Sequence, residues 1–430
     1  MQRLLSSLVF TVALLCPWAA LAQQGPSNCS VTSQNLWVRD QLTTYYYWYQ
    51  FLPTNINAAS FASPEAYLDA ARYKAVDKTY SYITSAAAND AFYSDSQVIK
   101  FGMTTQTTTS HINILQVWDG SPAFEAGIAR GDRITQINGQ TVASLVASGT
   151  IATAFGADQV GVTADVVFFK PSGEQRQARM VKRIVTIPTV SLTRVVEVDG
   201  RKVGYFSFLN FVRPSEAALN EAFAALREAG ATELVLDLRY NGGGLVDIAV
   251  HLSSLIGGSR TSGQVLLNYV HNDKVGPVLN KTTRFTNPDQ ALNLSRLVVI
   301  TTRGSASASE LLINGLRPYM PVVVIGDTTY GKPVGQYGFT FCDKVLAAVN
   351  FSVKNANLEG DYFDGIAPTC AAADDSSHQL GDPAEASFAE ALTFIRTGAC
   401  SANTAAASRS LRTLDTGPRP VGWQALINAQ

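Results

Sequence analysis

The segment 303–310 reads RGSASASE and lies between a predicted buried strand, 297–301, and a predicted helix. A serine on such a strand-to-helix turn lies at the carboxyl edge of a parallel sheet, where open α/β sheets bind ligands. The hydroxyl of Ser307 would lie there above the helix N-terminus, whose N–H groups and dipole favour a developing oxyanion. Ser307 and Glu310 also fit a capping box, in which the serine needs no catalytic role. The segment alone leaves both interpretations open.

A lysine in a comparable position favours the catalytic interpretation. The segment 326–332 reads GDTTYGK and follows the next predicted buried strand, 322–325, so it reaches the same edge of the sheet. Lys332 can act as a general base only as a neutral amine, and burial must lower its pKa from about 10.4. Gln336 lies four residues later, in a position to hold the amine. The alternative is a surface lysine in a β-turn.

A third segment that could take part in catalysis lies at the end of another predicted strand, 233–238. The segment 237–244 reads DLRYNGGG, and its glycines allow the backbone to approach a ligand and turn its N–H groups outward. Such N–H groups suit half of an oxyanion hole, which stabilises negative charge on the oxygen of an acyl-transfer intermediate. A plain tight turn would need only one or two glycines.

These segments lie in residues 186–400, which we expect to form an α/β domain. Predicted strands and helices alternate along it: strands 202–209, 233–238, 297–301 and 322–325, and helices 215–229, 246–256 and from 308 onward. This alternation favours a mainly parallel sheet with crossover helices.

Residues 96–185 are predicted to form a mainly β domain. The segment 112–117 is a short strand, 120–127 is a turn, a short helix and a glycine stop, and Asn138-Gly139 indicates a hairpin. The string SPA…AGI…GDRITQING resembles a PDZ domain of the circularly permuted, bacterial type. That resemblance implies that the loop Phe101-Gly102-Met103 presents backbone N–H groups to a substrate C-terminus. The alternative is a spacer domain that binds nothing.

Residues 23–95 are predicted to be helical. Ser63-Pro64-Glu65 supplies an N-cap, a proline at the first helical position and an early acid. The aromatic run 45–49 favours packing in a core or at a domain interface over a ligand surface. At the other end, residues 401–430 are rich in alanine, serine and threonine, and we expect a loose tail.

The first residues predict export. Arg3 supplies a positive charge, an apolar run covers residues 4–15, and Ala20-Leu21-Ala22 is a small-x-small cleavage site, so 1–22 is a predicted signal peptide. The alternative is a membrane anchor, but the run is short for a span and Pro17 interrupts it. We expect a periplasmic or secreted protein with no integral membrane segment after cleavage.

Four cysteines remain in the mature chain, and in an oxidising compartment they predict two disulfides with three pairings open. We expect Cys342 to pair with Cys370, because they bracket a strand–loop–strand segment. We expect Cys29 to pair with Cys400, because both lie near the ends of the folded chain. Neither the cysteines nor the four histidines have metal-ligand spacing, so we expect no metal and no cofactor.

Bulk composition limits the remaining classes of function. A chain of 430 residues predicts two or three domains, and 46% apolar with 16% charged residues predicts a large core rather than disorder. A net charge of −1 gives no electrostatic reason to expect nucleic acid or an acidic membrane as a partner.

The three sheet-edge segments together resemble the C-terminal-processing, or tail-specific, serine peptidase family. The resemblance covers residues of about 96–370 and is carried by DLRYNGGG, GSASASE and YGKPVGQ. In that family the middle serine of a triple-serine run is the nucleophile, and the base lysine follows 25 residues later, the spacing between Ser307 and Lys332. Pro333 departs from the family's glycine, and the late signature at 365–368 runs into Cys370 instead of an acid.

The resemblance assigns roles to residues at the sheet edge: Ser307 as nucleophile, Lys332 as general base, Gln336 as the orienting residue, and the backbone N–H groups of Ala308 and of Gly242 or Gly243 as oxyanion donors. Ser305 and Ser309 receive no catalytic role. The implied fold is an α/β peptidase core with a crotonase/ClpP-like sheet and crossover helices, a mainly β PDZ-like domain and an N-terminal helical segment.

The implied function is an exported serine endopeptidase that cleaves polypeptides and selects them by their C-termini. Whether the PDZ-like domain binds substrate or gates the site stays open, as do a homo-oligomeric state and an activating partner. One rival is a catalytically silent PDZ-containing periplasmic binding protein, against which the complete serine, lysine and glutamine set argues. A second rival is a crotonase-type acyl-CoA enzyme, against which export argues.

Overall fold

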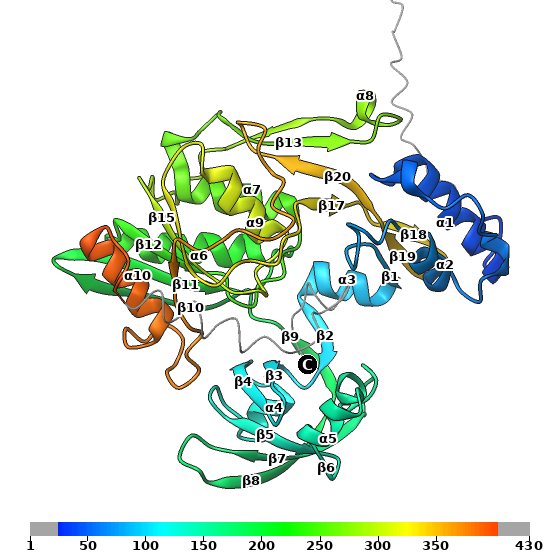
Figure 1. Ribbon diagram of the computed structural model, residues 1–430. Coiled ribbons are helices and arrows are strands. Elements are labelled where there is room, and N and C mark those ends of the chain that lie inside the picture. The colour runs from blue at the N-terminus through cyan, green and yellow to red at the C-terminus, as the bar shows by residue number, and fades with distance from the viewer. Residues whose placement is uncertain (1–24, 403–430) are drawn as a thin grey trace, which may run out of the picture.

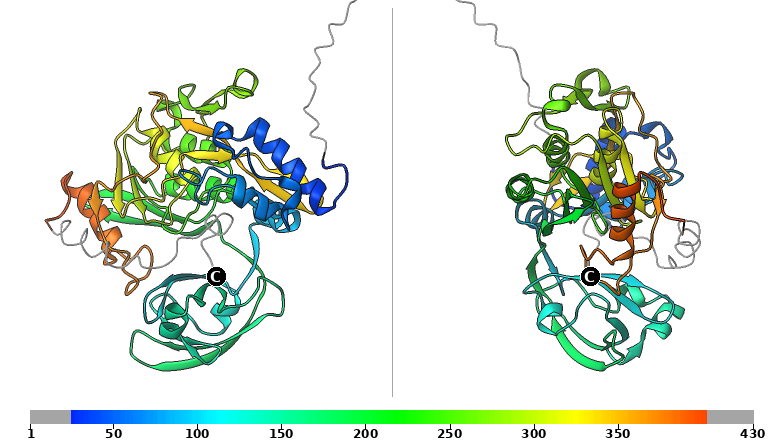
Figure 2. Two further views of the ribbon diagram at one scale, coloured as in Figure 1. Left: turned by 45° about the vertical axis from the view of Figure 1, so that its right-hand side comes forward. Right: turned by 90° about the vertical axis from the view of Figure 1, so that its left-hand side faces the viewer.

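The structure is a computed structural model that describes residues 25–402. The predicted signal peptide, 1–22, lies outside the described residues, as does the predicted tail beyond residue 402. Figure 1 shows an α/β core above, a β domain below it, and the N-terminal helices beside the core. The turned views in Figure 2 also place the β domain beneath the core. No helix among residues 25–402 is both long and apolar enough to cross a membrane.

The core is built on a six-stranded sheet. Its strands, in spatial order, are β10 (Val190–Val198), β11 (Arg201–Phe208), β12 (Glu233–Asp237), β15 (Leu297–Thr301), β16 (Val322–Gly326) and β21 (Cys370–Ala371). Strands β11 to β21 run parallel, whereas β10 is antiparallel to β11, so the prediction of a mainly parallel sheet is confirmed. The glycine, serine and lysine segments (237–244, 303–310 and 326–332) lie at the carboxyl ends of β12, β15 and β16, which are adjacent strands.

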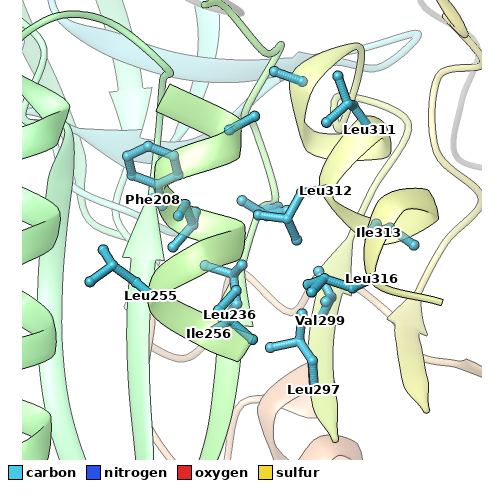
Figure 3. Close-up of a cluster of buried hydrophobic side chains, with 14 of the residues drawn as sticks. Phe208, Leu236, Leu255, Ile256, Leu297, Val299, Leu311, Leu312, Ile313 and Leu316 are labelled. Atoms are coloured by element: carbon cyan, nitrogen blue, oxygen red, sulfur yellow. The ribbon is translucent and has the colours of Figure 1, made fainter. Parts of the chain in front are cut away.

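Helices cover both faces of this sheet: α6 (Ser215–Glu228), α7 (Val246–Gly257) and α9 (Ala308–Leu316) on one face and α10 (Ala386–Thr397) on the other. Leu236 and Val299 face the first layer, and Val235 and Val298 face α10, because side chains alternate along a strand. Figure 3 shows apolar side chains of α7 and α9 packed over Leu236 and Val299. Each such buried side chain stabilises the fold by about 1.5–3 kcal/mol.

Two smaller sheets connect the core to the N-terminal unit. One has the order β14 (Thr282–Arg284), β13 (Val265–His271), β20 (Val349–Lys354) and β17 (Val334–Gln336), and the other has the order β1 (Tyr82–Ser85), β19 (Lys344–Ala347) and β18 (Phe339–Phe341). A short helix, α8 (Gly276–Leu279), joins β13 to β14. The helical prediction was wrong for β1, because pairing with β19 satisfies its backbone groups and β-branched and aromatic residues suit a strand.

The rest of the N-terminal unit is mainly helical, as expected. It contains α1 (Val31–Tyr45), α2 (Pro64–Ala71) and α3 (Ala86–Asp95), with short 3-10 turns at Tyr49–Phe51 and Ala58–Ser60. The Ser63 side chain accepts a hydrogen bond from the N–H of Ala66, so the predicted start of α2 is confirmed. Within the aromatic run, Tyr46 is fully buried and its ring meets that of Trp48 edge-on, so the packing interpretation is confirmed.

The β domain carries the predicted PDZ-like elements. Its sheet has the order β3 (Met103–Thr107), β4 (Ile112–Val117), β5 (Arg133–Ile137), β7 (Thr163–Phe169) and β8 (Gln175–Val181), with β6 (Gln140–Thr141) paired to β5 and with helices α4 (Pro122–Glu125) and α5 (Val142–Ala147). Asn138 and Gly139 both have positive φ, 50° and 79°, as the predicted hairpin turn requires. Strands β2 (Gln97–Lys100) and β9 (Arg183–Thr186) pair with each other where the chain enters and leaves this domain.

The two disulfides differ from the expected pairings. Cys29 bonds Cys342 and Cys370 bonds Cys400, so both predicted pairs were wrong. Helix α1 follows Cys29 and packs on the β18–β19 hairpin that carries Cys342, through stacking of the Trp37 and Phe341 rings. Strand β21 places Cys370 beneath α10, which ends shortly before Cys400. Packing of elements distant in sequence therefore decides the pairing.

We predict that non-reducing peptide mapping recovers Cys29 linked to Cys342. Replacing both cysteines by serine should lower the free energy of unfolding by about 2–4 kcal/mol, because this bond closes a long loop in the unfolded chain. The matched control is the Cys370–Cys400 pair, which spans only 30 residues and should cost less when removed. Recovery of a Cys29–Cys400 peptide would contradict the structure.

Candidate active site

The three serines of the turn between β15 and α9 differ in their hydrogen bonding and exposure. The hydroxyl of Ser305 donates to the carbonyl of Leu238 at 2.8 Å, and that of Ser309 donates to the carbonyl of Asn241 at 3.0 Å, both in buried surroundings. Ser307 is half-exposed and has φ 55° and ψ −111° at the N-cap of α9, a strained conformation for a non-glycine residue. Its side chain faces the backbone N–H of Glu310 in a capping box, and among the described residues its hydroxyl donates no hydrogen bond.

A buried carboxylate, that of Glu310, joins the serine turn to the lysine turn. It accepts hydrogen bonds from the backbone N–H groups of Ser307 at 2.9 Å, Gly331 at 2.7 Å and Lys332 at 2.8 Å. The hydroxyl of Thr329 is a fourth donor, at 2.5 Å. Burial raises the pKa of Glu310, although these donors act in the opposite direction. The predicted cap at Glu310 is present, and its bonds to the lysine turn were not foreseen.

Lys332 is buried between the core and the N-terminal unit. Loss of hydration lowers its pKa to about 8, while the charges of Asp77 and Glu310 oppose that shift. Among the described residues, its amine forms no hydrogen bond and no ion pair within the usual distance limits. A large fraction of this lysine is therefore neutral in mildly alkaline solution, which an exposed lysine would not be.

Gln336 lies on β17, four residues after Lys332. Its Nε2 donates to the backbone carbonyl of Tyr80 at 2.6 Å. The hydroxyl of Tyr80 in turn donates to the carbonyl of Gly331 at 2.5 Å. Gln336 thus holds the lysine segment against the N-terminal unit, and its direct orientation of the Lys332 amine stays a prediction.

The glycine loop after β12 lies directly against the serine turn. A Cβ atom on Gly243 would lie 2.8 Å from Cβ of Ser307 and 2.9 Å from the backbone nitrogen of Ala308, so only glycine fits there. The N–H of Gly243 already donates to Oδ1 of Asn241 at 2.8 Å. Within residues 25–402, the N–H groups of Gly242 and Ala308 have no hydrogen-bond acceptor, which leaves both available to a ligand.

A charged network that the sequence did not reveal anchors this loop. The hydroxyl of Tyr240 donates to Asp374 at 2.7 Å and accepts from Arg130 of the β domain at 2.8 Å. Arg239 forms buried ion pairs with Asp374 at 3.1 Å and with Glu385 at 2.8 Å. Burial favours a higher pKa for Asp374, but Arg239 and Arg130 outweigh it and hold the pKa below its ordinary value.

The loop predicted to receive a substrate C-terminus lies at the start of β3, the edge strand of the β-domain sheet. The side chains of Phe101 and Met103 are buried in the domain core. Gly102 has φ 85°, and a Cβ there would lie 2.2 Å from that of Ser121, so a side chain is excluded. The backbone carbonyls of Phe101 and Gly102 accept hydrogen bonds from other residues of the β domain. Strand β3 pairs with β4 on one side, and its other side has no strand partner among the described residues.

The described residues contain one group of three potential metal ligands, Cys370, Glu390 and Cys400. Its two sulfur atoms are bonded to each other, so they are not thiolates that could hold an ion. His271, at the end of β13, is hydrogen-bonded through its two ring nitrogens to Asn280 and Tyr337.

Fold and site together define a peptidase-type α/β core with a PDZ-like domain, and comparisons with known proteins agree. The profile of peptidase family S41 matches residues 202–371, that of the S41 N-terminal domain matches 33–82, and that of a PDZ domain matches 114–150. The chain therefore belongs to the C-terminal-processing serine peptidase family, S41, with a PDZ domain.

Individual relatives support this assignment. A CtpA-like serine protease of Staphylococcus aureus is 25% identical over 62% of this chain and 51% of its own length. The carboxy-terminal processing protease CtpA of Bacillus subtilis is 26% identical over 73% of this chain and 63% of its own length. The chain thus spans about half to two thirds of the length of these curated relatives.

Solved structures show the same fold. An S41 protease from Bacteroides fragilis superimposes with a TM-score of 0.69 at 27% identity, over 84% of this chain and 96% of that one. The photosystem II D1 C-terminal processing protease superimposes with a TM-score of 0.52 at 20% identity, over 81% of this chain and 94% of that one. The second comparison supports the fold alone.

Proposed function

We propose that this protein is an exported serine endopeptidase with Ser307 as nucleophile and Lys332 as general base. The observation that carries the proposal is that Glu310 ties a strained, half-exposed serine to a buried lysine whose pKa is lowered to about 8. The neighbouring serines are engaged in structural hydrogen bonds, which leaves Ser307 as the available hydroxyl.

The proposed reaction begins when the neutral amine of Lys332 takes the hydroxyl proton of Ser307 as its oxygen bonds to the scissile carbonyl carbon. The carbonyl oxygen becomes negatively charged, and the N–H groups of Ala308 and Gly242 stabilise it. We prefer Gly242 to Gly243 because the latter N–H is already bonded to Asn241. The intermediate then expels the amine product, which takes the proton from the lysine, and water hydrolyses the remaining ester by the same steps.

Two disulfides support an oxidising compartment, and hence export to the periplasm or outside the cell. The proposed substrates are polypeptides. The catalytically silent binding protein remains the rival, since all three domain types would also be present in an inactive relative. A non-catalytic protein would have no need for a buried lysine of lowered pKa whose turn is joined through Glu310 to that of a strained serine, because both features cost stability.

The serine series tests the proposal. We predict that Ser307→Ala lowers kcat/KM on unfolded casein by at least about a thousandfold while the free energy of unfolding is unchanged. The control, Ser305→Ala, should retain the activity but lose about 1–3 kcal/mol of stability, because it leaves buried hydrogen-bonding groups unpaired. Loss of activity in Ser305→Ala with retention in Ser307→Ala would overturn the assignment.

Lysine ionisation gives a second test. Since the neutral amine is the active form, kcat/KM should rise with pH through one midpoint near the Lys332 pKa of about 8 and level off above it. Below the midpoint the rate should fall about tenfold per pH unit. Lys332→Arg should be inactive at every pH, because a guanidinium keeps its proton. Measurable turnover by the arginine variant would exclude Lys332 as the base.

The PDZ domain leads to a third prediction. We propose that the loop 101–103 and edge strand β3 bind the free C-terminus of a substrate by strand addition. An unfolded polypeptide with an amidated C-terminus should then be cut several-fold more slowly than the same polypeptide with a free carboxylate. A charged tail should have the same effect. Equal rates for all three substrates would indicate that the domain is a spacer or a gate.

A further inference from the structure

The N-terminal unit contacts both ends of the lysine segment through one residue. The hydroxyl of Tyr80 donates to the carbonyl of Gly331, next to Lys332, at 2.5 Å. The backbone carbonyl of Tyr80 accepts a hydrogen bond from the side chain of Gln336 at 2.6 Å. A turn of the N-terminal unit, residues 77–81, therefore determines where the lysine segment lies.

At the start of that turn stands a fully buried carboxylate, that of Asp77. Its Oδ1 accepts from the N–H groups of Tyr80 at 3.0 Å and Ser81 at 2.9 Å. Its Oδ2 accepts from the hydroxyls of Tyr46 at 2.7 Å and Ser81 at 2.5 Å. Among residues 25–402 no cation lies within ion-pair distance of this carboxylate, although the guanidinium of Arg72 donates to the backbone carbonyl of Asp77 at 2.7 Å. A buried charge is costly unless opposite charges lie near it.

The carboxylate is also fixed relative to the strand that follows the lysine. The Ser81 hydroxyl, which donates to Asp77, accepts from the N–H of Val349 at 3.0 Å. Val349 on β20 is the pairing partner of Gln336 on β17. Asp77 and Lys332 are thus held in a common framework although they belong to different structural units.

We propose that Asp77 is a positioning residue of the catalytic centre, whose negative charge stabilises the ammonium that Lys332 becomes when it takes the Ser307 proton. The N-terminal unit would then be part of the catalytic machinery rather than an appendage. This inference rests on the serine–lysine mechanism proposed above. It names a residue that the spacing of the sheet-edge motifs does not reveal, since Asp77 lies 255 positions before Lys332.

Two carboxylates act on Lys332, and they differ in their setting. Glu310 is held by three backbone N–H groups and is needed to join the two turns. Asp77 comes from outside the core. Both charges oppose the fall in the Lys332 pKa that burial causes. Tyr46, beside Asp77, and Tyr362, beside Glu310, have pKa values raised by burial, so these phenols stay neutral in the working range.

The test compares the pH dependence of kcat/KM for the full-length wild type and Asp77→Asn, with unfolded casein as substrate. Asparagine has nearly the same shape, and the two hydroxyls at Oδ2 can accept from its amide instead of donating. We expect the midpoint to move about one unit toward lower pH, because an opposite charge near the lysine is lost. The plateau should fall by up to about tenfold, because a less basic amine takes the proton less readily.

The matched control is Tyr46→Phe, which removes a hydrogen bond from the same carboxylate but keeps its charge. We expect a lower melting temperature and a midpoint that does not move toward lower pH. If Asp77→Asn keeps the wild-type midpoint, or if Tyr46→Phe shifts the midpoint downward equally, Asp77 has only a structural role and the inference fails.

A second variant, Asp77→Ser, tests the same inference if Asp77→Asn does not fold. Serine at position 77 can still accept from the backbone N–H groups of the turn, as serine commonly does in turns, and it is neutral. Asp77→Ser should therefore show the same downward shift, and an unchanged midpoint would overturn the inference. Failure of the mechanism itself would look different, because the wild type would then lack activity or Lys332→Arg would retain it.

Discussion

The site depends on one buried interaction, the four hydrogen bonds that converge on the carboxylate of Glu310. Three come from backbone N–H groups of two turns that follow adjacent parallel strands, and one comes from the Thr329 hydroxyl. A buried carboxylate is costly unless its acceptor sites are filled, so the two turns can hold it only in their native relation. The distance between the serine and the lysine is therefore a consequence of satisfying this one group.

The strain at Ser307 is maintained by its surroundings. Its positive φ persists because the hydroxyls on either side bond the glycine loop and because Gly243 packs against it without a side chain. Below the turn, apolar strands covered by helices on both faces give a rigid base. Rigidity matters for the proposed chemistry, since oxyanion donors must be in place before charge develops.

Both additional units reach the same edge of the sheet by charged or polar contacts. Arg130 of the β domain bonds Tyr240 in the glycine loop, and Tyr80 of the N-terminal unit bonds Gly331 in the lysine turn. The core is thus contacted from two sides at the loops that would carry catalysis. Such contacts are polar because these loops are irregular and their backbone groups need partners.

The sequence by itself determined four parallel strands and three helices of the core, the hairpin at Asn138-Gly139, the family, and Ser307 and Lys332 as candidates. Apolar runs, turn residues and motif spacing are local signals, and local signals determine such features. Only the tertiary structure decided the disulfide pairing, the strand β1, the partner of Gln336, and the presence of Asp77 and Arg130 beside the site. Each of these depends on which distant segments pack together, and packing is set by complementary surfaces that no local pattern contains.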